Sequence, residues 1–210
     1  RNIVALGYRE WINHYVGMSH YFRLAWAPET GKFIVATGPG GQVLNTPARK
    51  WHADFYARAR MLGYRVITSL SFELLDEHAP DAWKQRDHAG TAALTGWEPP
   101  STLLSPCHAD ARAYLQAVAG EFCGLAAAGG LPVDFQIGEP WWWSGFGETR
   151  RPCFYDAATT AAYTAETGRP VPTPHQSVTE QPDAAQVQYL DWLGEKLGPA
   201  TPPIRDPVEA

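Results

Sequence analysis

The sequence predicts an α/β fold in which helices alternate with buried parallel strands. Two segments with helical periodicity, 46–63 and 108–130, are each followed at once by a short apolar run, 64–75 and 131–140. This repeated order has the length of a right-handed crossover between parallel strands. A chain of 210 residues with 45% hydrophobic content can also bury a substantial core.

The N-terminal segment 21–47 predicts one strand of the sheet and a hairpin-like excursion. Turn residues lie at Pro28–Gly31 and again at Gly38–Gly41, between apolar runs. Such spacing is typical of antiparallel strands joined by tight turns.

The helix predicted over 46–63 has a marked beginning and end. Thr46 is a candidate N-cap, Pro47 suits the first turn, and Gly63 suits the C-terminal stop. The residues predicted to form its buried side recur at helical spacing: Trp51, Phe55, Ala59, Met61 and Leu62. The run 64–75 that follows is rich in β-branched and aromatic residues and predicts one buried strand.

The second helix follows a long connection, 76–107, which is predicted to be mostly loop with one short helix. The buried side predicted for the helix over 108–130 comprises Ala111, Tyr114, Leu115, Val118 and Phe122. The apolar run 131–140 then predicts another short strand.

The composition changes beyond Arg151. A helix is predicted from Asp156, then a proline-rich connection over 169–183, then an amphipathic helix over 184–198. We therefore expect residues 1–150 to form the sheet-containing part and residues 151–210 a helical, proline-rich extension.

Charge and composition exclude several classes of function. The net charge is −5 and no run of Lys or Arg occurs, which disfavours a nucleic-acid partner. No apolar run approaches the roughly 18 residues of a membrane span. Cys107, Cys123 and Cys153 are widely spaced and match no standard zinc pattern, so we expect no disulfide framework, metal or other cofactor.

Two carboxylates follow predicted strands, where parallel α/β folds place their functional residues. Glu73 closes one strand and Glu139 the next, and both are candidates for general acid or base catalysis. Pro140 and the aromatic run Trp141, Trp142 and Trp143 follow Glu139; aromatic faces stack on sugar rings, and apolar surroundings raise a carboxyl pKa. Alternatively, Glu139 caps the next helix or pairs with Arg150 or Arg151.

Aromatic residues elsewhere are further candidates for the same cleft. Trp97 and Glu98 lie on the long loop expected on the same side of the sheet as Glu139, although simple loop packing explains them equally well. Tyr155 and Trp83 are weaker candidates for substrate binding. A tryptophan-rich surface also serves as the anchor of a protein interface.

Several motifs resemble known families. The stretch "QIGEP" resembles the Asn-Glu-Pro signature after the fourth strand of (β/α)₈ glycoside hydrolases, in which the Glu is the acid/base, and "CFYDAATTAAYTAETG" is similar to the following segment of family 42 β-galactosidase-like enzymes. Residues 13–197, with "ALTGWEPPSTLLSP" and "FQIGEPWWW", more closely resemble TIM-barrel-like domains of tail proteins from phages, prophages and gene-transfer-agent-like particles. This resemblance implies a TIM-barrel-like fold, complete or truncated, and a place in the virion tail.

The sequence departs from the hydrolase pattern at two points. Gly138 stands where the hydrolases have the Asn that contacts the sugar 2-hydroxyl. The roughly 70 residues after Glu139 cannot hold four further βα units of about 30 residues. We therefore expect either a fragment or an incomplete barrel, with Glu73, Glu98 or Glu148 as the second carboxylates available in this sequence.

Two functions follow from this resemblance. The first is a tail-associated structural or carbohydrate-binding domain with a glycosidase-like cleft, whose partners are envelope glycans, other tail proteins or copies of itself. The second is a retaining glycoside hydrolase with Glu139 as acid/base, Trp141, Trp142 and Trp143 as subsite walls, and a nucleophile outside this chain. The two departures favour the first.

Overall fold

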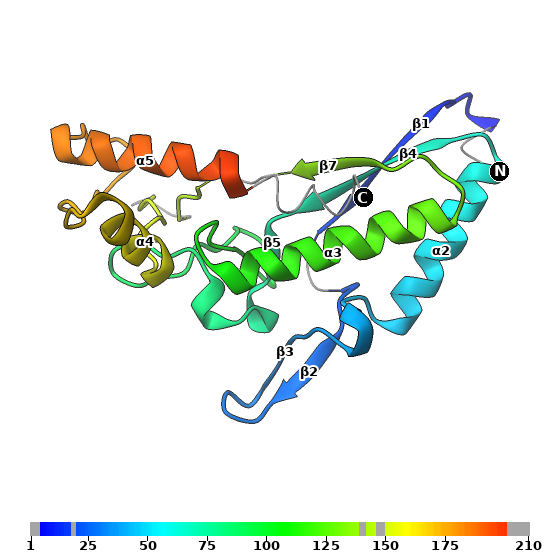
Figure 1. Ribbon diagram of the computed structural model, residues 1–210, viewed down its shortest axis with the longest axis horizontal. Coiled ribbons are helices and arrows are strands. Elements are labelled where there is room, and N and C mark those ends of the chain that lie inside the picture. Colours follow the sequence, from blue (N-terminus) through cyan, green and yellow to red (C-terminus); the bar gives the residue numbers. More distant parts are fainter. Residues whose placement is uncertain (1–4, 18–19, 139–141, 146–149, 201–210) are drawn as a thin grey trace.

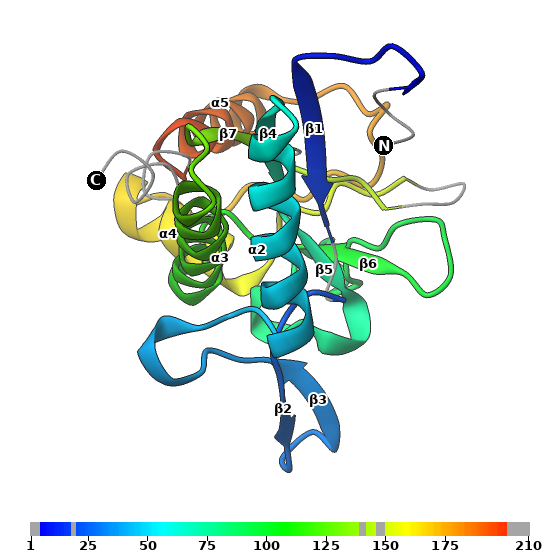
Figure 2. The same ribbon diagram turned by 90° about the vertical axis from the view of Figure 1, so that its right-hand side faces the viewer.

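A three-stranded parallel sheet forms the centre of the protein. The computed structural model describes residues 5–17, 20–138, 142–145 and 150–200, without the side chains of 199 and 200. Strands β1 (Trp11–Val16), β4 (Arg65–Ser71) and β7 (Asp134–Gly138) lie in the order β1-β4-β7. Helices α2 (Thr46–Met61) and α3 (Ala109–Ala128) connect them and pack side by side against one face (Figures 1 and 2). The predicted α/β fold with parallel strands is confirmed, and the described strands form an open sheet rather than a closed barrel.

The two faces of the sheet differ in burial. Val16 of β1 pairs with Leu70 of β4 on the face that packs against the helices, and both are buried. On the opposite face, the Arg65 guanidinium lies 4.1 Å from the centre of the exposed Trp11 ring and forms a 2.9 Å ion pair with Asp134. These contacts link all three strands at their amino ends.

Helix α2 begins one residue earlier than predicted and presents a different face to the core. The N-cap is Asn45 rather than Thr46, since the Asn45 side chain accepts a hydrogen bond from the Ala48 N–H. The buried residues are Ala48, His52, Tyr56 and Ala59. Trp51 and Met61, predicted to be buried, are 55% and 74% exposed.

The physical reason is that one ring nitrogen of His52 and the hydroxyl of Tyr56 find partners inside. The His52 Nδ1–H donates to the Ala48 carbonyl at 2.7 Å, and the Tyr56 hydroxyl lies 2.8 Å from Thr68 Oγ1 on β4. A buried aromatic residue with a satisfied polar group is as suitable for a core as an aliphatic one.

Helix α3 matches its prediction. All five residues expected on its inner side are buried: Ala111, Tyr114, Leu115, Val118 and Phe122. The Glu121 carboxylate of the same helix accepts hydrogen bonds from the N–H groups of Val43 and Leu44, at 2.7 and 3.1 Å. Helix α3 therefore also holds the segment that leads into α2.

Two antiparallel pairs are inserted into the βαβαβ core. The predicted hairpin is confirmed as β2 (Leu24–Ala27) and β3 (Lys32–Val35), and it projects from the body of the molecule (Figures 1 and 2). The run 64–75, predicted as one strand, breaks at Phe72 into β4 and β5 (Glu73–Leu75). Strand β5 turns away to pair with β6 (Ser101–Leu103), and the connection between them includes 3₁₀ turns at 76–78 and 81–83.

The C-terminal helices have a core of their own. Helices α4 (Ala157–Thr167) and α5 (Ala184–Ala200) confirm the two predicted helices and lie together at one end of the molecule (Figure 1). Their buried contact comprises Phe154, Tyr163, Tyr189, Trp192 and Leu193. Residues 201–210, with the remaining prolines, lie outside the described residues. Among described helices, none combines the length and apolar character needed to cross a bilayer.

Candidate functional site

Several predicted site residues lie outside the described part of the chain. Glu139, Trp141 and Glu148 belong to this group, so their predicted roles in catalysis or substrate binding stay predictions. Strand β7 ends at Gly138, immediately before Glu139.

Glu73 lies where the carboxyl ends of β1 and β4 meet. Its side chain is buried, at 4% exposure, and its backbone N–H donates to Ser71 Oγ at 3.3 Å. One carboxylate oxygen is 3.0 Å from the position that a Cβ on Gly17 would take, so glycine at the end of β1 leaves room for this carboxylate. The location is the one predicted, and the catalytic role stays a prediction.

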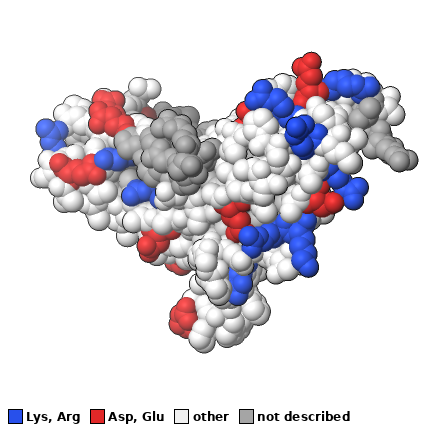
Figure 3. Space-filling model, turned by 45° about the vertical axis from the view of Figure 1, so that its right-hand side comes forward, with Lys and Arg blue, Asp and Glu red and all other residues white. Residues whose placement is uncertain are grey.

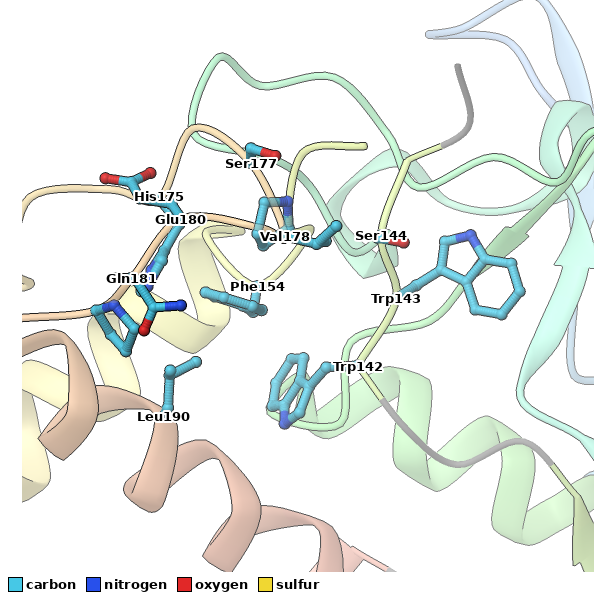
Figure 4. Close-up of a pocket in the computed structure, with 12 residues that line it drawn as sticks. Trp142, Trp143, Ser144, Phe154, His175, Ser177, Val178, Glu180, Gln181 and Leu190 are labelled. Carbon is cyan, nitrogen blue, oxygen red and sulfur yellow. The ribbon is translucent and has the colours of Figure 1, made fainter. Parts of the chain in front are cut away.

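A pocket of about 540 Å³ lies between the aromatic run and helix α5. One side is formed by residues 142–144 with Pro152 and Phe154, and the other by residues of the segment 175–182 with Leu190 of α5. Figure 4 shows Trp142, Phe154 and Leu190 turned towards one another across it. Apolar side chains therefore face one another across the pocket, and polar residues such as Glu180 and Gln181 also line it.

The two described tryptophans point in opposite directions. The Trp142 Nε1–H donates to the Leu193 carbonyl at 2.9 Å, and its ring packs against the core of α4 and α5. The Trp143 ring turns away from the pocket and packs on the main core, while its backbone N–H donates to Gln85 Oε1 at 2.9 Å (Figure 4). Consecutive tryptophans thus connect the two cores, and of these two rings only that of Trp142 is turned into the pocket.

Tyr155 contacts His175, which lines the pocket. Its hydroxyl accepts a hydrogen bond from the His175 N–H at 2.9 Å and lies 3.2 Å from His175 Nδ1. Burial raises the pKa of Tyr155, against the opposing effect of the hydrogen bond from His175. Tyr155 therefore positions a residue that lines the pocket, without lining it directly.

The polar groups at the rim are partly used within the protein. The Glu180 carboxylate accepts a hydrogen bond from the Gln176 N–H at 2.7 Å, and the Ser177 hydroxyl lies 3.0 Å from the Thr179 hydroxyl. Gln181 extends its amide over the opening (Figure 4).

Trp97 and Glu98 are not part of this pocket. Both are exposed on the connection between β5 and β6, and neither lines the cavity. Trp83, a weaker candidate, instead packs against the main core beside Tyr114.

Metal binding finds no support in the part of the chain that the structure describes. No group of three His, Cys, Asp or Glu side chains there could hold an ion. Cys107, Cys123 and Cys153 are all free thiols, as expected from their spacing.

Sequence reasoning missed the half of the pocket that comes from the C-terminal segment. His175, Glu180 and Leu190 are separated from Trp142 by more than 30 positions and follow no common motif. The amphipathic period of α5 indicated that Leu190 would be turned inward, but it did not indicate which aromatic residue it would meet.

Comparison with known proteins identifies the family of this chain. A search of curated protein sequences finds no match. The model of the TIM-barrel domain of non-contractile tail sheath proteins matches residues 1–210. With the parallel βαβαβ core described above, this match shows that the chain belongs to the TIM-barrel family of the non-contractile tail sheath protein.

Proposed function

We propose that this chain is a structural domain of a phage tail sheath that binds further copies of itself, and that its β2–β3 hairpin anchors the contact. Membership of the family supports a structural role in a phage tail, and with it a location in the virion. The proposal adds the part of the molecule through which copies meet.

The observation that carries the proposal is an exposed aromatic pair on the hairpin. Trp26 and Phe33 lie directly opposite each other on β2 and β3, with ring centroids 5.2 Å apart. They are 55% and 52% exposed on an element that projects from the body (Figures 1 and 2). Paired aromatic rings at a protruding site are typical anchors of protein interfaces.

The hairpin is held in place before any partner arrives. Its base is fixed by backbone bonds from the Arg23 N–H to the Val43 carbonyl at 2.7 Å and from the Ala36 N–H to the Arg23 carbonyl at 2.9 Å. The Phe33 carbonyl also accepts a bond from His78 Nδ1–H at 2.8 Å. A preformed element loses less conformational entropy on binding.

Sedimentation velocity over a range of protein concentrations tests this proposal. Trp26→Ser is expected to weaken self-association about tenfold or more, as loss of an aromatic anchor does. Trp97→Ser is the matched control, because Trp97 is similarly exposed but lies on another loop. Equal association of the two variants and the unmodified protein would contradict the proposal.

Glycan binding in the pocket beside Trp142 is a second candidate function. It is favoured by the aromatic walls, Trp142 and Phe154, combined with rim groups such as Gln181. Titration with a panel of purified envelope glycans, followed by tryptophan fluorescence, would detect it, and Gln181→Ala is expected to weaken the binding. No fluorescence change with any glycan counts against this function.

Hydrolysis is the corresponding catalytic alternative, with Glu139 as acid/base. Release of reducing ends from the same glycans, compared with Glu139→Gln, tests it. A loss of release by orders of magnitude in the variant would support catalysis, and no release from either protein would reject it.

A further inference from the structure

Several polar groups of the pocket beside Trp142 are partly engaged within the protein. The Trp142 Nε1–H is bonded to the Leu193 carbonyl, and Glu180 and Ser177 have partners within their own segment. A sugar needs several hydrogen bonds from its site, and each one missing leaves a polar group without a partner. These features favour an occupant that is mainly apolar.

The walls and size of the pocket suit aromatic side chains. Trp142, Phe154 and Leu190 face one another across a cavity of about 540 Å³ (Figure 4). Cavities of about 300–1,000 Å³ hold compact ligands. Trp26 and Phe33, side by side on two adjacent strands, are such a compact apolar group and are exposed on the same chain.

Each of the two surfaces carries an exposed charge that the contact can use. Exposed Lys32 precedes Phe33 in the chain near the tip of the hairpin, where Glu29 is also exposed, and exposed Glu180 lies on the rim of the pocket. Lys and Arg also gather on the face above the hairpin (Figure 3). Arg23, which precedes β2, and Arg49 and Lys50, in the first turns of α2, are exposed, and Arg49 is paired with Glu121 at 3.4 Å. Asp183, Asp191 and Glu195 are exposed on or next to α5, and Lys196 of the same helix is partly buried. Opposite charges on two surfaces favour their encounter in one orientation.

The two surfaces lie in different parts of the molecule. The hairpin projects below the sheet in the view of Figure 1, whereas α5 lies at the upper left. A contact between two different patches of identical copies is heterologous, and its repetition generates a ring or a filament.

We infer that the hairpin of one copy enters the Trp142 pocket of the next, with Trp26 and Phe33 against its apolar walls and Lys32 beside Glu180. This inference rests on the proposed function and adds the acceptor surface. A glycan is the alternative occupant of the pocket, and one result of the experiments below would indicate it.

Charge reversal in the full chain tests the contact. Lys32→Glu places like charges at the contact, and so does Glu180→Lys, so each is expected to weaken self-association about tenfold. The double variant Lys32→Glu/Glu180→Lys restores opposite charges and is expected to recover the affinity of the unmodified protein. Arg58→Glu is the control, because it changes the net charge as Lys32→Glu does, at an exposed position on α2.

A mixing experiment gives a second, independent measurement. Lys32→Cys and Glu180→Cys variants are expected to form a disulfide-linked pair when mixed under oxidising conditions, and neither variant is expected to do so alone. Each single-variant control measures the disulfides that the native thiols form. Few are expected, since Cys123 and Cys153 are buried and Cys107 is partly buried.

The outcomes separate this inference from the proposed function. If Trp26→Ser weakens association but Glu180→Lys does not, the pocket is not the acceptor and the proposed function stands. If none of these variants has an effect, both are wrong. If glycans bind the pocket while the hairpin variants associate normally, the pocket is a glycan site and the inference is rejected.

Discussion

At the scale of single residues, the half-buried His14 of β1 and the buried His52 of α2 face each other. The rings of His14 and His52 are 5.1 Å apart, among Trp51, Phe55 and Tyr56. Among the described residues, neither Nε2 atom has a hydrogen-bond partner, although both are buried. Burial and, secondarily, the neighbouring His52 lower the pKa of His14 from 6.5 to about 4, and burial also lowers that of His52.

These lowered pKa values predict acid sensitivity. A histidine with a lower pKa in the folded than in the unfolded state has no effect on stability above its unfolded pKa. As the pH falls from 6.5 towards 4, the unfolded chain binds protons that folded His14 rejects, so stability decreases.

The Tm of His14→Phe is therefore expected to fall less than that of the unmodified protein between pH 7 and pH 5, measured by circular dichroism. His108→Asn is the control, because asparagine preserves the N-cap of α3. An identical pH slope in His14→Phe and the unmodified protein would assign the acid sensitivity to other groups.

The hydroxyl pair of Tyr56 and Thr68 predicts a second effect. Tyr56→Phe leaves the buried Thr68 hydroxyl without this 2.8 Å partner. A loss of about 1–3 kcal/mol in the free energy of unfolding is expected, measured with urea. Adding Thr68→Val should recover part of that loss, and a double variant less stable than either single one would argue against this explanation.

At the scale of elements, periodicity predicted the helices and the strands β4 and β7. It did not predict β1, which precedes the segment 21–47, or β6, which lies in a predicted loop, or which side of α2 is buried. Apolar spacing favoured Trp51 and Met61, whereas the core took His52 and Tyr56, because His52 Nδ1 and the Tyr56 hydroxyl find partners there. The five residues predicted on the inner side of α3 are all buried, since that side is mostly apolar. The break at Phe72 was not predictable, because the run on both sides of it has the composition of a strand.

Substitutions at the start of α2 test which residue is the N-cap: Asn45, as in the structure, or Thr46, as predicted from the sequence. Asn45→Ala is expected to lower the free energy of unfolding by about 1 kcal/mol, because Asn45 accepts the Ala48 N–H at 2.8 Å. Thr46→Ala, at an exposed helical position, should change it by less than about 0.5 kcal/mol. The reverse order of effects in urea denaturation would show that Thr46 is the cap.

At the scale of the whole molecule, the sheet core and the core of α4 and α5 are connected by consecutive tryptophans. Trp143 packs on the first core, and Trp142 packs on the second and bonds to Leu193. The sequence predicted an aromatic surface beside Glu139, but it could not predict that one ring would enter each core. That outcome depends on contacts between segments far apart in the chain.

Weakening this connection should affect one end of the molecule. Trp142→Phe removes the bond to the Leu193 carbonyl, so amide hydrogen exchange is expected to accelerate in α5 and not in β4. Mass spectrometry of exchanged peptides measures both regions at once. Uniform acceleration across the two would mean that the cores unfold as one unit.

The two ends of the hairpin lie close together, since the Ala36 N–H donates to the Arg23 carbonyl at its base. An insertion of this kind can lengthen, shorten or change its sequence in evolution while the strands and helices around it stay as they are. Substitutions confined to the hairpin can thus change which partner surface it fits while the rest of the domain is left as it is.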